Sequence, residues 1–188
     1  TTTTIKKYGL GFAPETWDAL SRYLLQQGFT EEELLLADVS RRSRRGTLID
    51  TFRNRVIFPI VDLRGNVIGF GGRVLDDSQP KYLNTAQTPV FDKGKNLFSL
   101  QFAKNSVTTT LILAEGYMDV IAVHQAGFEN VVATLGTAIT PDQARKISQY
   151  AKTVIIAYDS DAAGQAATQK AMRHFSEVGI ETKILRMQ

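Results

Sequence analysis

Two short segments share one pattern, TLILAEGYMD at residues 110–119 and TVIIAYDSDAAG at residues 153–164. Each begins with apolar and β-branched residues typical of a buried strand, and acidic residues follow directly. Ligands of open α/β sheets bind at the carboxyl ends of the strands, so neighbouring strands would bring Glu115 and Asp159 to one site, with Asp161 within reach. Hard cations such as Mg²⁺ need only one or two carboxylates besides water and phosphate oxygens. The two segments therefore predict a divalent-metal site that handles phosphate.

The same acidic residues have simpler interpretations, which the sequence alone leaves open. An Asp-x-Asp pair after a strand is typical of a helix cap, and Glu115-Gly116 could merely end a strand. Two such segments in consecutive crossover units, with Gly116 and Gly164 leaving room for close approach, favour a metal site. Asp119 is a further candidate, although an acid is also favoured where a helix begins. The loop at residues 135–138 follows the intervening strand and could offer backbone N–H groups to phosphate.

From residue 108 onward, apolar strand segments alternate with helical ones. We expect strands at residues 110–114, 131–134, 153–158 and 182–185, with helices near residues 119–125, 141–150 and 163–178. Short apolar strands joined by helices indicate a mainly parallel sheet covered by helices on both faces. We place a domain boundary near Val107. The expected fold class is α/β, with a mixed α+β subdomain at residues 1–107 and a parallel-sheet subdomain at residues 108–188.

The first subdomain is expected to begin with helices and continue into a hairpin. Apolar residues at helical spacing, Trp17, Leu20, Leu24 and Leu25, predict a helix over residues 15–27. Thr30 and Glu33 form the pattern of a capping box and predict a second helix. Residues 56–61 and 67–70 read as a hairpin in which Pro59 favours an edge or a bulge. The glycines at residues 69–72 fit a kinked strand better than a dinucleotide-binding loop, because no helix follows them.

Positive charge is concentrated in the first subdomain, although the net charge of the chain is only +3. Six arginines stand in residues 41–55 beside the single acid Asp50, and further basic residues surround Tyr82. A run of charges is often a solvated loop, and a phosphate-binding surface has the same appearance in sequence. Both interpretations remain open for these residues.

Composition excludes several classes of protein and site. The 188 residues include 43% hydrophobic residues, enough for a core, and no cysteine, so disulfides, thiolate zinc sites and a Cys nucleophile are excluded. No apolar run approaches the roughly 20 residues that span a bilayer. Neither the P-loop nor the nucleophile-elbow pattern is present. His124 and His174 fall in expected helices without a paired histidine, and Tyr117 and Tyr158 are interpreted as packing residues.

Several quoted stretches resemble a known family. EGYMDV at residues 115–120, TLGT at 134–137 and AYDSDAAG at 157–164 resemble the Toprim domain shared by DnaG-type primases, topoisomerases and some nucleases. GLGFAP at 9–14, FRNRVIFPI at 52–60, GFGGR at 69–73 and PKYLN at 80–84 are similar to the RNA-polymerase core of bacterial replicative primases. The resemblance covers nearly the whole chain and identifies the second subdomain as Toprim.

The resemblance implies DNA-dependent synthesis of short RNA primers on a single-stranded DNA template. A primer 3′-hydroxyl would attack the α-phosphate of a ribonucleoside triphosphate, with bound metals stabilising the attacking and leaving oxygens. By motif, Glu115, Asp159 and Asp161 would be catalytic and hold Mg²⁺ or Mn²⁺, supported by Asp119. The residues that would bind DNA or nucleotide are Arg53, Arg55, Arg73, Lys81, Asn84 and Lys93. The segment containing Arg41, Arg42, Arg44 and Arg45 matches no family motif, and we interpret it as a solvated or auxiliary patch.

The resemblance also implies a setting. We expect a monomeric bacterial protein of the cytoplasm, associated with the nucleoid and replisome and not with a membrane. The family's zinc-binding domain and its helicase-binding domain have no counterpart here, so zinc and the replicative helicase are expected to involve other domains. The family's Toprim domain continues into a further acidic cluster beyond the fourth strand and then into a helical subdomain. The sequence stops at Gln188, before both. We therefore expect a fragment that folds but primes weakly or not at all.

Two other functions compete with primer synthesis. In the first, the chain is a binding module, in which the Toprim half serves as a scaffold or nucleotide sensor and the basic half holds single-stranded DNA. In the second, it is a Toprim nuclease, which the primase-like first half argues against. Metal-dependent nucleotide binding would distinguish the enzyme from the module, and degradation of DNA without ribonucleotides would identify the nuclease.

Overall fold

The computed structural model describes residues 1–106 and 108–185. Two compact units can be distinguished, one formed by residues 1–60 and 67–92, the other by residues 61–66 and the chain from Lys93 onward. We call them unit 1 and unit 2. The boundary expected near Val107 lies outside the described residues and stays a prediction. Within the described residues, no helix is both long and apolar enough to cross a membrane.

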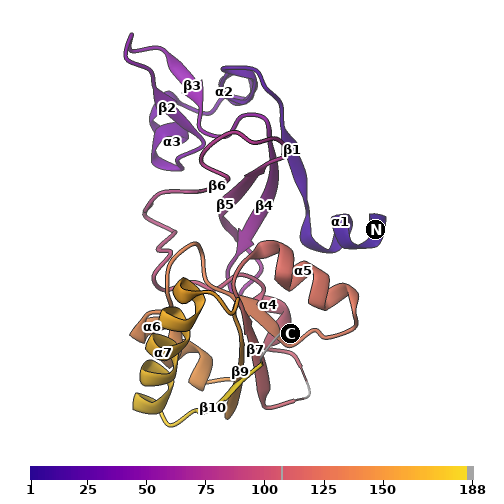
Figure 1. Cartoon of the computed structure of the whole chain (residues 1–188). Coiled ribbons are helices and arrows are strands. Elements are labelled where there is room, and N and C mark those ends of the chain that lie inside the picture. Colours follow the sequence, from indigo (N-terminus) through magenta and orange to yellow (C-terminus); the bar gives the residue numbers. More distant parts are fainter. Residues whose placement is uncertain (107, 186–188) are drawn as a thin grey trace. The chain divides into compact units, whose positions relative to one another are not determined.

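Unit 1 combines helices with a mixed set of short and long strands (Figure 1). A four-stranded sheet has the order β1-β4-β5-β6, in which β1 is antiparallel to β4 and β6 is antiparallel to β5. Strands β2 and β3 form a separate antiparallel ribbon. The elements are α1 (Thr2–Tyr8), β1 (Gly11–Ala13), α2 (Ala19–Gln26), α3 (Glu31–Leu36), β2 (Ser40–Arg42), β3 (Leu48–Asp50), β4 (Arg55–Val61), β5 (Val67–Val74) and β6 (Tyr82–Asn84).

The first expected helix is shorter than its apolar pattern suggests. Helix α2 begins at Ala19 after the N-cap residue Asp18, so Trp17 lies outside it. Leu20 and Leu25 are exposed, and the buried residue of the helix is Ser21. The carboxylate of Asp50 on β3 accepts from the N–H groups of Leu20 and Ser21. This polar contact holds the helix, where the sequence predicted an apolar face. The capping box of Thr30 and Glu33 at the start of α3 is confirmed.

The glycine-rich stretch is a strand, as predicted, and packing explains two of its glycines. A Cβ atom on Gly72 would lie 2.8 Å from the ring of Phe52, and one on Gly69 would lie 3.2 Å from Thr85. Both glycines therefore allow side chains to pack directly on the β5 backbone. Strand β4 is an interior strand, so of the two alternatives expected from Pro59, an edge or a bulge, the edge position is wrong. Its pairing with β1 ends at Ile57, so the missing N–H of Pro59 costs no hydrogen bond to β1.

Unit 2 is a parallel sheet with helices on both sides, as the alternating pattern predicts (Figure 1). The strand order is β10-β9-β7-β8, and all three pairings are parallel. Apolar residues of these strands, including Leu113, Val154 and Ile156, are fully buried. The elements are α4 (Leu100–Ala103), β7 (Thr110–Ala114), α5 (Tyr117–Gln125), β8 (Val131–Ala133), α6 (Pro141–Ser148), β9 (Thr153–Ala157), α7 (Ala162–Glu177) and β10 (Glu181–Ile184).

A buried glutamine anchors the segment before α4 to helix α6. Gln143 is 0% exposed, and its side-chain amide donates to the carbonyls of Lys93 at 2.9 Å and Asn96 at 2.7 Å. Its oxygen accepts from the N–H of Thr140, which completes the capping box of α6. A buried polar group without a partner costs about 1–3 kcal/mol.

We expect Gln143→Leu to lower the free energy of unfolding by about 2 kcal/mol, because the carbonyls of Lys93 and Asn96 lose a buried donor. Urea titration followed by circular dichroism measures this change. Gln165→Leu is the control: its amide also donates to a carbonyl, that of Ser160 at 2.9 Å, but at an exposed position, so the midpoint should stay nearly unchanged. Equal stability of the two variants would contradict the anchoring role of Gln143.

Candidate active site

Two acidic residues lie side by side at the carboxyl edge of the parallel sheet. Strands β7 and β9 are adjacent and parallel, with Ala114 opposite Ala157, so the residues that follow them emerge together. The backbone N–H of Asp159 donates to Oε1 of Glu115 at 2.7 Å. Both residues are exposed. The expectation that their strands are neighbours is therefore confirmed.

The other two acids of the predicted site cap helices. Oδ1 of Asp161 accepts from the N–H of Gly164 at 2.7 Å, so Asp161 is the N-cap of α7. Oδ2 of Asp119 accepts from the N–H of Gly116 at 3.0 Å in the first turn of α5. Capping uses one oxygen of Asp161, and the other accepts no hydrogen bond among the described residues, so the two interpretations of this residue are compatible. Within residues 1–106 and 108–185, no group of three or more acidic, histidine or cysteine side chains is gathered closely enough to hold a metal ion.

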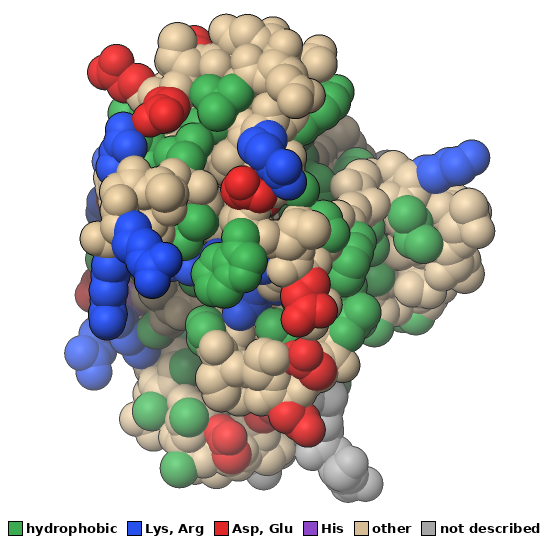
Figure 2. Space-filling model, turned by 90° about the horizontal axis from the view of Figure 1, so that it is seen from above, with side chains coloured by type: hydrophobic (Ala, Val, Ile, Leu, Met, Phe, Trp, Pro, Cys, Tyr) green, Lys and Arg blue, Asp and Glu red, His purple; other side chains and the backbone are tan. Residues whose placement is uncertain are grey.

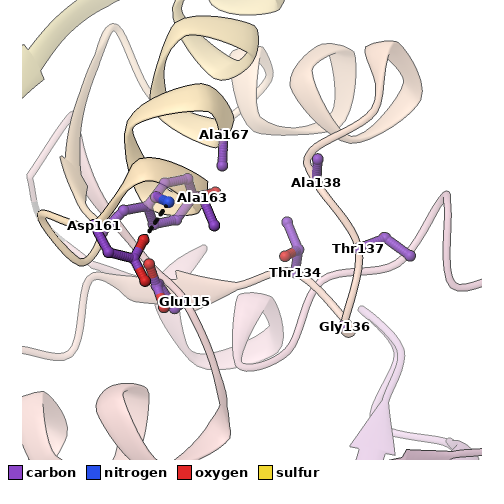
Figure 3. Close-up of a pocket in the computed structure, with 10 residues that line it drawn as sticks. Glu115, Thr134, Gly136, Thr137, Ala138, Asp161, Ala163 and Ala167 are labelled. Atoms are coloured by element: carbon purple, nitrogen blue, oxygen red, sulfur yellow. Dashed lines mark hydrogen bonds between the residues drawn. The ribbon is translucent and has the colours of Figure 1, made fainter.

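A pocket of about 390 Å³ is lined by two of the predicted acids, Glu115 and Asp161, whereas Asp159 and Asp119 do not line it. Figure 3 shows the carboxylates of Glu115 and Asp161 directed toward one another on one side, and the loop from Thr134 to Ala138 on the other. Ala163, Gly164 and Ala167 of α7 line the pocket with small side chains. Oγ1 of Thr137 is buried without a hydrogen-bond partner among the described residues. The pocket is therefore bordered by carboxylates on one side and, on the other, by a loop whose Thr137 hydroxyl has no hydrogen-bond partner among the described residues.

Gly164 allows α7 to approach the backbone at Asp159. A Cβ atom at this position would lie 2.1 Å from the carbonyl oxygen of Asp159, far inside van der Waals contact. At Gly116 the nearest atom would lie 3.7 Å away, an ordinary contact. Gly164 is therefore required by the packing of α7, whereas the packing around Gly116 leaves room for a side chain.

The two tyrosines that adjoin the acidic segments are buried packing residues. Tyr158 is buried, and burial, followed by the negative charge of Glu115, raises the pKa of its hydroxyl. A tyrosine with a raised pKa is a poor source of tyrosinate, so it does not suit a nucleophilic role. Tyr117 is buried and its ring meets that of Phe98 edge to face. The interpretation of both tyrosines as packing residues is confirmed.

Arg55, one of the predicted phosphate-binding residues, is a buried residue of unit 1. It is 7% exposed, and its guanidinium donates to the carbonyls of Pro80 at 2.9 Å, Gly72 at 3.3 Å and Lys81 at 3.4 Å. Burial lowers the pKa of Arg55, partly opposed by the charge of Asp76. In this position, Arg55 holds the segment that carries Lys81.

We expect Arg55→Met to lower the free energy of unfolding by about 3 kcal/mol, because three carbonyls lose a charged donor. Chemical unfolding monitored by fluorescence and limited proteolysis near Lys81 would both report the change. Lys81→Met, which removes an exposed charge, should leave stability nearly unchanged. If Arg55→Met were as stable as Lys81→Met, the structural role assigned to Arg55 would be wrong.

The remaining predicted basic residues lie at several places. In unit 1, Arg53 is half-buried between β3 and β4, and Arg73 of β5 lies 5.8 Å from the ring centroid of Tyr82. Lys81 is exposed, and Asn84 on β6 is half-buried. Lys93 is exposed and belongs to unit 2, in the segment anchored by Gln143. Thr134, which belongs to the TLGT stretch but was given no role of its own, lies directly after β8 and lines the pocket.

The chemistry of the carboxylates fits a hard cation. Glu115 and Asp161 present oxygen ligands beside an open pocket, and Mg²⁺ binds through one or two carboxylates with water and phosphate filling the other positions. The donor set contains neither nitrogen nor sulfur, which disfavours zinc. The site could therefore hold Mg²⁺ or Mn²⁺ without further protein ligands.

Comparisons with known proteins agree over the whole chain. Residues 1–104 match the family model for the N-terminal domain of the DNA primase catalytic core, and residues 112–188 match a Toprim-like model. A DNA primase from Clostridium acetobutylicum is 50% identical over 185 residues, covering 98% of this chain and 31% of the relative. The chain thus spans about a third of the length of such relatives.

Solved structures show the same fold. The Escherichia coli primase catalytic core is 37% identical with a TM-score of 0.91, covering 100% of this chain and 62% of that one. A structure described as the DnaG primase catalytic domain bound to single-stranded DNA is 37% identical with a TM-score of 0.90, again covering 100% and 62%. Both halves of the chain match the family, and the fold and the acidic strand ends described above agree with these matches. This chain belongs to the DnaG-type DNA primase catalytic core family.

Proposed function

We propose that this chain supplies the catalytic centre of primer synthesis in a bacterial replication protein. The observation that carries the proposal is the hydrogen bond from Asp159 N–H to Glu115, which joins the ends of two adjacent strands and fixes the Glu115 carboxylate at the pocket that it lines. Family membership supports the reaction class, nucleotidyl transfer. The substrates would be ribonucleoside triphosphates and a growing RNA primer on single-stranded DNA.

Glu115, Asp159 and Asp161 would hold Mg²⁺ or Mn²⁺ at the pocket, with Asp119 fixing the start of α5. When bound, such ions supply positive charge that stabilises the oxygens of a reacting phosphate. The Asp159 N–H orients the carboxylate of Glu115, and the cap on Gly164 orients that of Asp161. The small side chains of α7 leave space for a nucleotide, and the loop at residues 134–138 would contact its phosphates.

Arg53, Arg73, Lys81, Asn84 and Lys93 would contact the template or nucleotide, and Arg55 would act by holding the Lys81 segment. A relative of known structure is described as bound to single-stranded DNA, which supports this assignment. Contact with the replicative helicase would fall to parts of the longer relatives that this chain does not match.

A synthesis assay with the full-length parent protein tests the proposal against a nuclease. We expect labelled ribonucleotides to enter short chains on a single-stranded DNA template, only when a divalent cation is added. Degradation of the template without ribonucleotides would establish the nuclease instead. Binding of DNA with neither reaction would support the binding module and contradict the proposed enzyme.

A further inference from the structure

A buried threonine faces the acidic side of the pocket in unit 2. Thr134 directly follows β8, whose three apolar residues are fully buried. It is itself only 5% exposed and lines the pocket together with Glu115 and Asp161. Figure 3 shows its side chain directed into the space between the loop and the two carboxylates, whereas the side chain of Thr137 points away from the carboxylates. Thr134 is therefore the threonine of this loop that can meet a molecule bound beside the acids.

The hydroxyl of Thr134 makes no hydrogen bond within the described residues. Two comparable buried hydroxyls are bonded internally, because that of Thr85 accepts from the N–H of Phe70 at 2.9 Å and that of Ser21 donates to the carboxylate of Asp50 at 2.6 Å. Buried polar groups generally have a partner. Since Thr134 borders a pocket, a bound molecule can supply the partner that the protein does not.

The position of Thr134 is fixed by the strand that precedes it. Ala133 pairs with Ala114 of β7 on one side. On its other side, the N–H of Ala133 donates to the carbonyl of Phe98 at 3.2 Å, and its carbonyl accepts from the N–H of Phe98 at 2.9 Å. Leu135, the residue after Thr134, is buried as well. A group held in this way loses little freedom when it binds a ligand.

The wall around Thr134 is neutral and consists of small residues. Gly136 and Ala138 of the loop and Ala163 and Ala167 of α7 border the same pocket. Among the described residues that line it there is no lysine, arginine or histidine. Basic side chains are frequent elsewhere on the protein, and Figure 2 shows several on the face that it draws. A phosphate would be attracted to the cation at the carboxylates, whereas this wall suits an uncharged polar group.

The ribose is the uncharged part of a ribonucleotide that carries hydroxyl groups. A ribose hydroxyl both donates and accepts hydrogen bonds, and so does the hydroxyl of threonine. The pocket volume of about 390 Å³ lies within the roughly 300–1,000 Å³ that is typical of ligand sites. The small side chains of the wall leave that volume open for the sugar ring. The chemistry of the wall and of the hydroxyl therefore matches the sugar of the substrate.

We propose that the hydroxyl of Thr134 forms a hydrogen bond with a ribose hydroxyl of the ribonucleotide and makes Thr134 a specificity-determining residue of the site. The inference rests on the proposed function and names the part of the substrate that this residue recognises. A substrate without that hydroxyl would leave the buried Thr134 unpaired. A site built around a substrate hydroxyl rejects the analogue that lacks it for this reason.

Extension of an RNA primer by one nucleotide on single-stranded DNA, catalysed by the full-length parent protein, tests this inference. The measured quantity is kcat/KM for ATP, 2′-deoxyATP and 3′-deoxyATP. We expect Thr134→Val, which keeps the shape of the side chain, to lower kcat/KM for ATP about tenfold. For one of the two deoxy analogues the value should stay within about twofold, because that analogue already lacks the bond. The unaffected analogue identifies which ribose hydroxyl is contacted.

Three further variants control this experiment. Thr134→Ser keeps the hydroxyl and should retain the discrimination within about threefold, whereas Thr134→Ala removes it without adding bulk and should lose the discrimination as Thr134→Val does. Thr110→Val is the matched control, because Thr110 begins β7 at the opposite end of the strand from the acids. It should leave all three values of kcat/KM within about twofold. Circular dichroism verifies that each variant folds.

An equal loss of kcat/KM for ATP and for both analogues in Thr134→Val would overturn the ribose contact, because it would indicate a phosphate contact or a displaced loop. Unchanged discrimination in Thr134→Val and Thr134→Ala would overturn it as well and would leave the proposed enzyme intact, since the unmodified protein would still incorporate ribonucleotides. Absence of incorporation by the unmodified protein would contradict the proposed enzyme itself and the ribose contact with it.

Discussion

Glu115→Gln in the full-length parent protein is expected to lower the rate of ribonucleotide incorporation about a thousandfold. Such a loss corresponds to about 4 kcal/mol of activation free energy. Glutamine keeps an oxygen that can accept the hydrogen bond from Asp159 N–H and nearly the same volume, so the main change is the lost negative charge beside the pocket. Incorporation of labelled ribonucleotides on single-stranded DNA is the measurement.

Glu181→Gln provides a control for this substitution. Glu181 is an exposed glutamate at the start of β10, the opposite end of the strand from the acidic edge, and it accepts a hydrogen bond from Thr153. We expect this variant to retain its activity within about twofold, because no site group is altered. Equal activity of Glu115→Gln and the unmodified protein would remove Glu115 from the catalytic centre.

Gly164→Ala is expected to lower the free energy of unfolding by about 3 kcal/mol and to reduce activity as well. The added Cβ would lie 2.1 Å from the carbonyl oxygen of Asp159, so either α7 or the Asp159 backbone must move. Movement of Asp159 would disturb its hydrogen bond to Glu115. Denaturant unfolding and the incorporation assay measure the two effects.

Gly116→Ala is the matched control for Gly164→Ala. Its Cβ would meet Oδ2 of Asp119 at 3.7 Å, an ordinary contact, and we expect a loss of no more than about 1 kcal/mol at this N-cap position. If Gly164→Ala were as stable as Gly116→Ala, the close packing of α7 on Asp159 would not hold in solution.

The parallel sheet could be predicted from sequence because its strands are short, apolar and separated by helices with clear caps. Thr140, for example, predicted both the start of α6 and the return bond from Gln143. Ligands of open α/β sheets bind at the carboxyl ends of the strands, and this rule predicted a common site for the acids that follow β7 and β9 if the two strands were neighbours. The structure makes them neighbours. Local signals and a general rule of sheet topology were sufficient there.

Other features depend on contacts between segments distant in sequence, which a local pattern does not contain. Arg55 resembles a surface cation in sequence, yet three backbone carbonyls from other segments surround it. In sequence Trp17 fits an apolar helical face, yet α2 begins two residues after it, at Ala19, and Trp17 is exposed. The start of this helix is held by the distant residue Asp50, whose carboxylate accepts from the N–H of Leu20. The ribbon of β2 and β3 was not predicted because each strand is only three residues long and the arginines at residues 41–45 were interpreted as a solvated patch.

Paramagnetic broadening by Mn²⁺ tests the central claim most directly. In an amide NMR spectrum of the 188-residue chain, we expect substoichiometric Mn²⁺ to broaden first the signals of Gly116, Ser160 and Gly164, which surround the paired acids. The double variant Glu115→Gln with Asp159→Asn should abolish this selective broadening. Broadening confined to other residues, or unchanged in the double variant, would contradict a metal site at the carboxyl edge of β7 and β9.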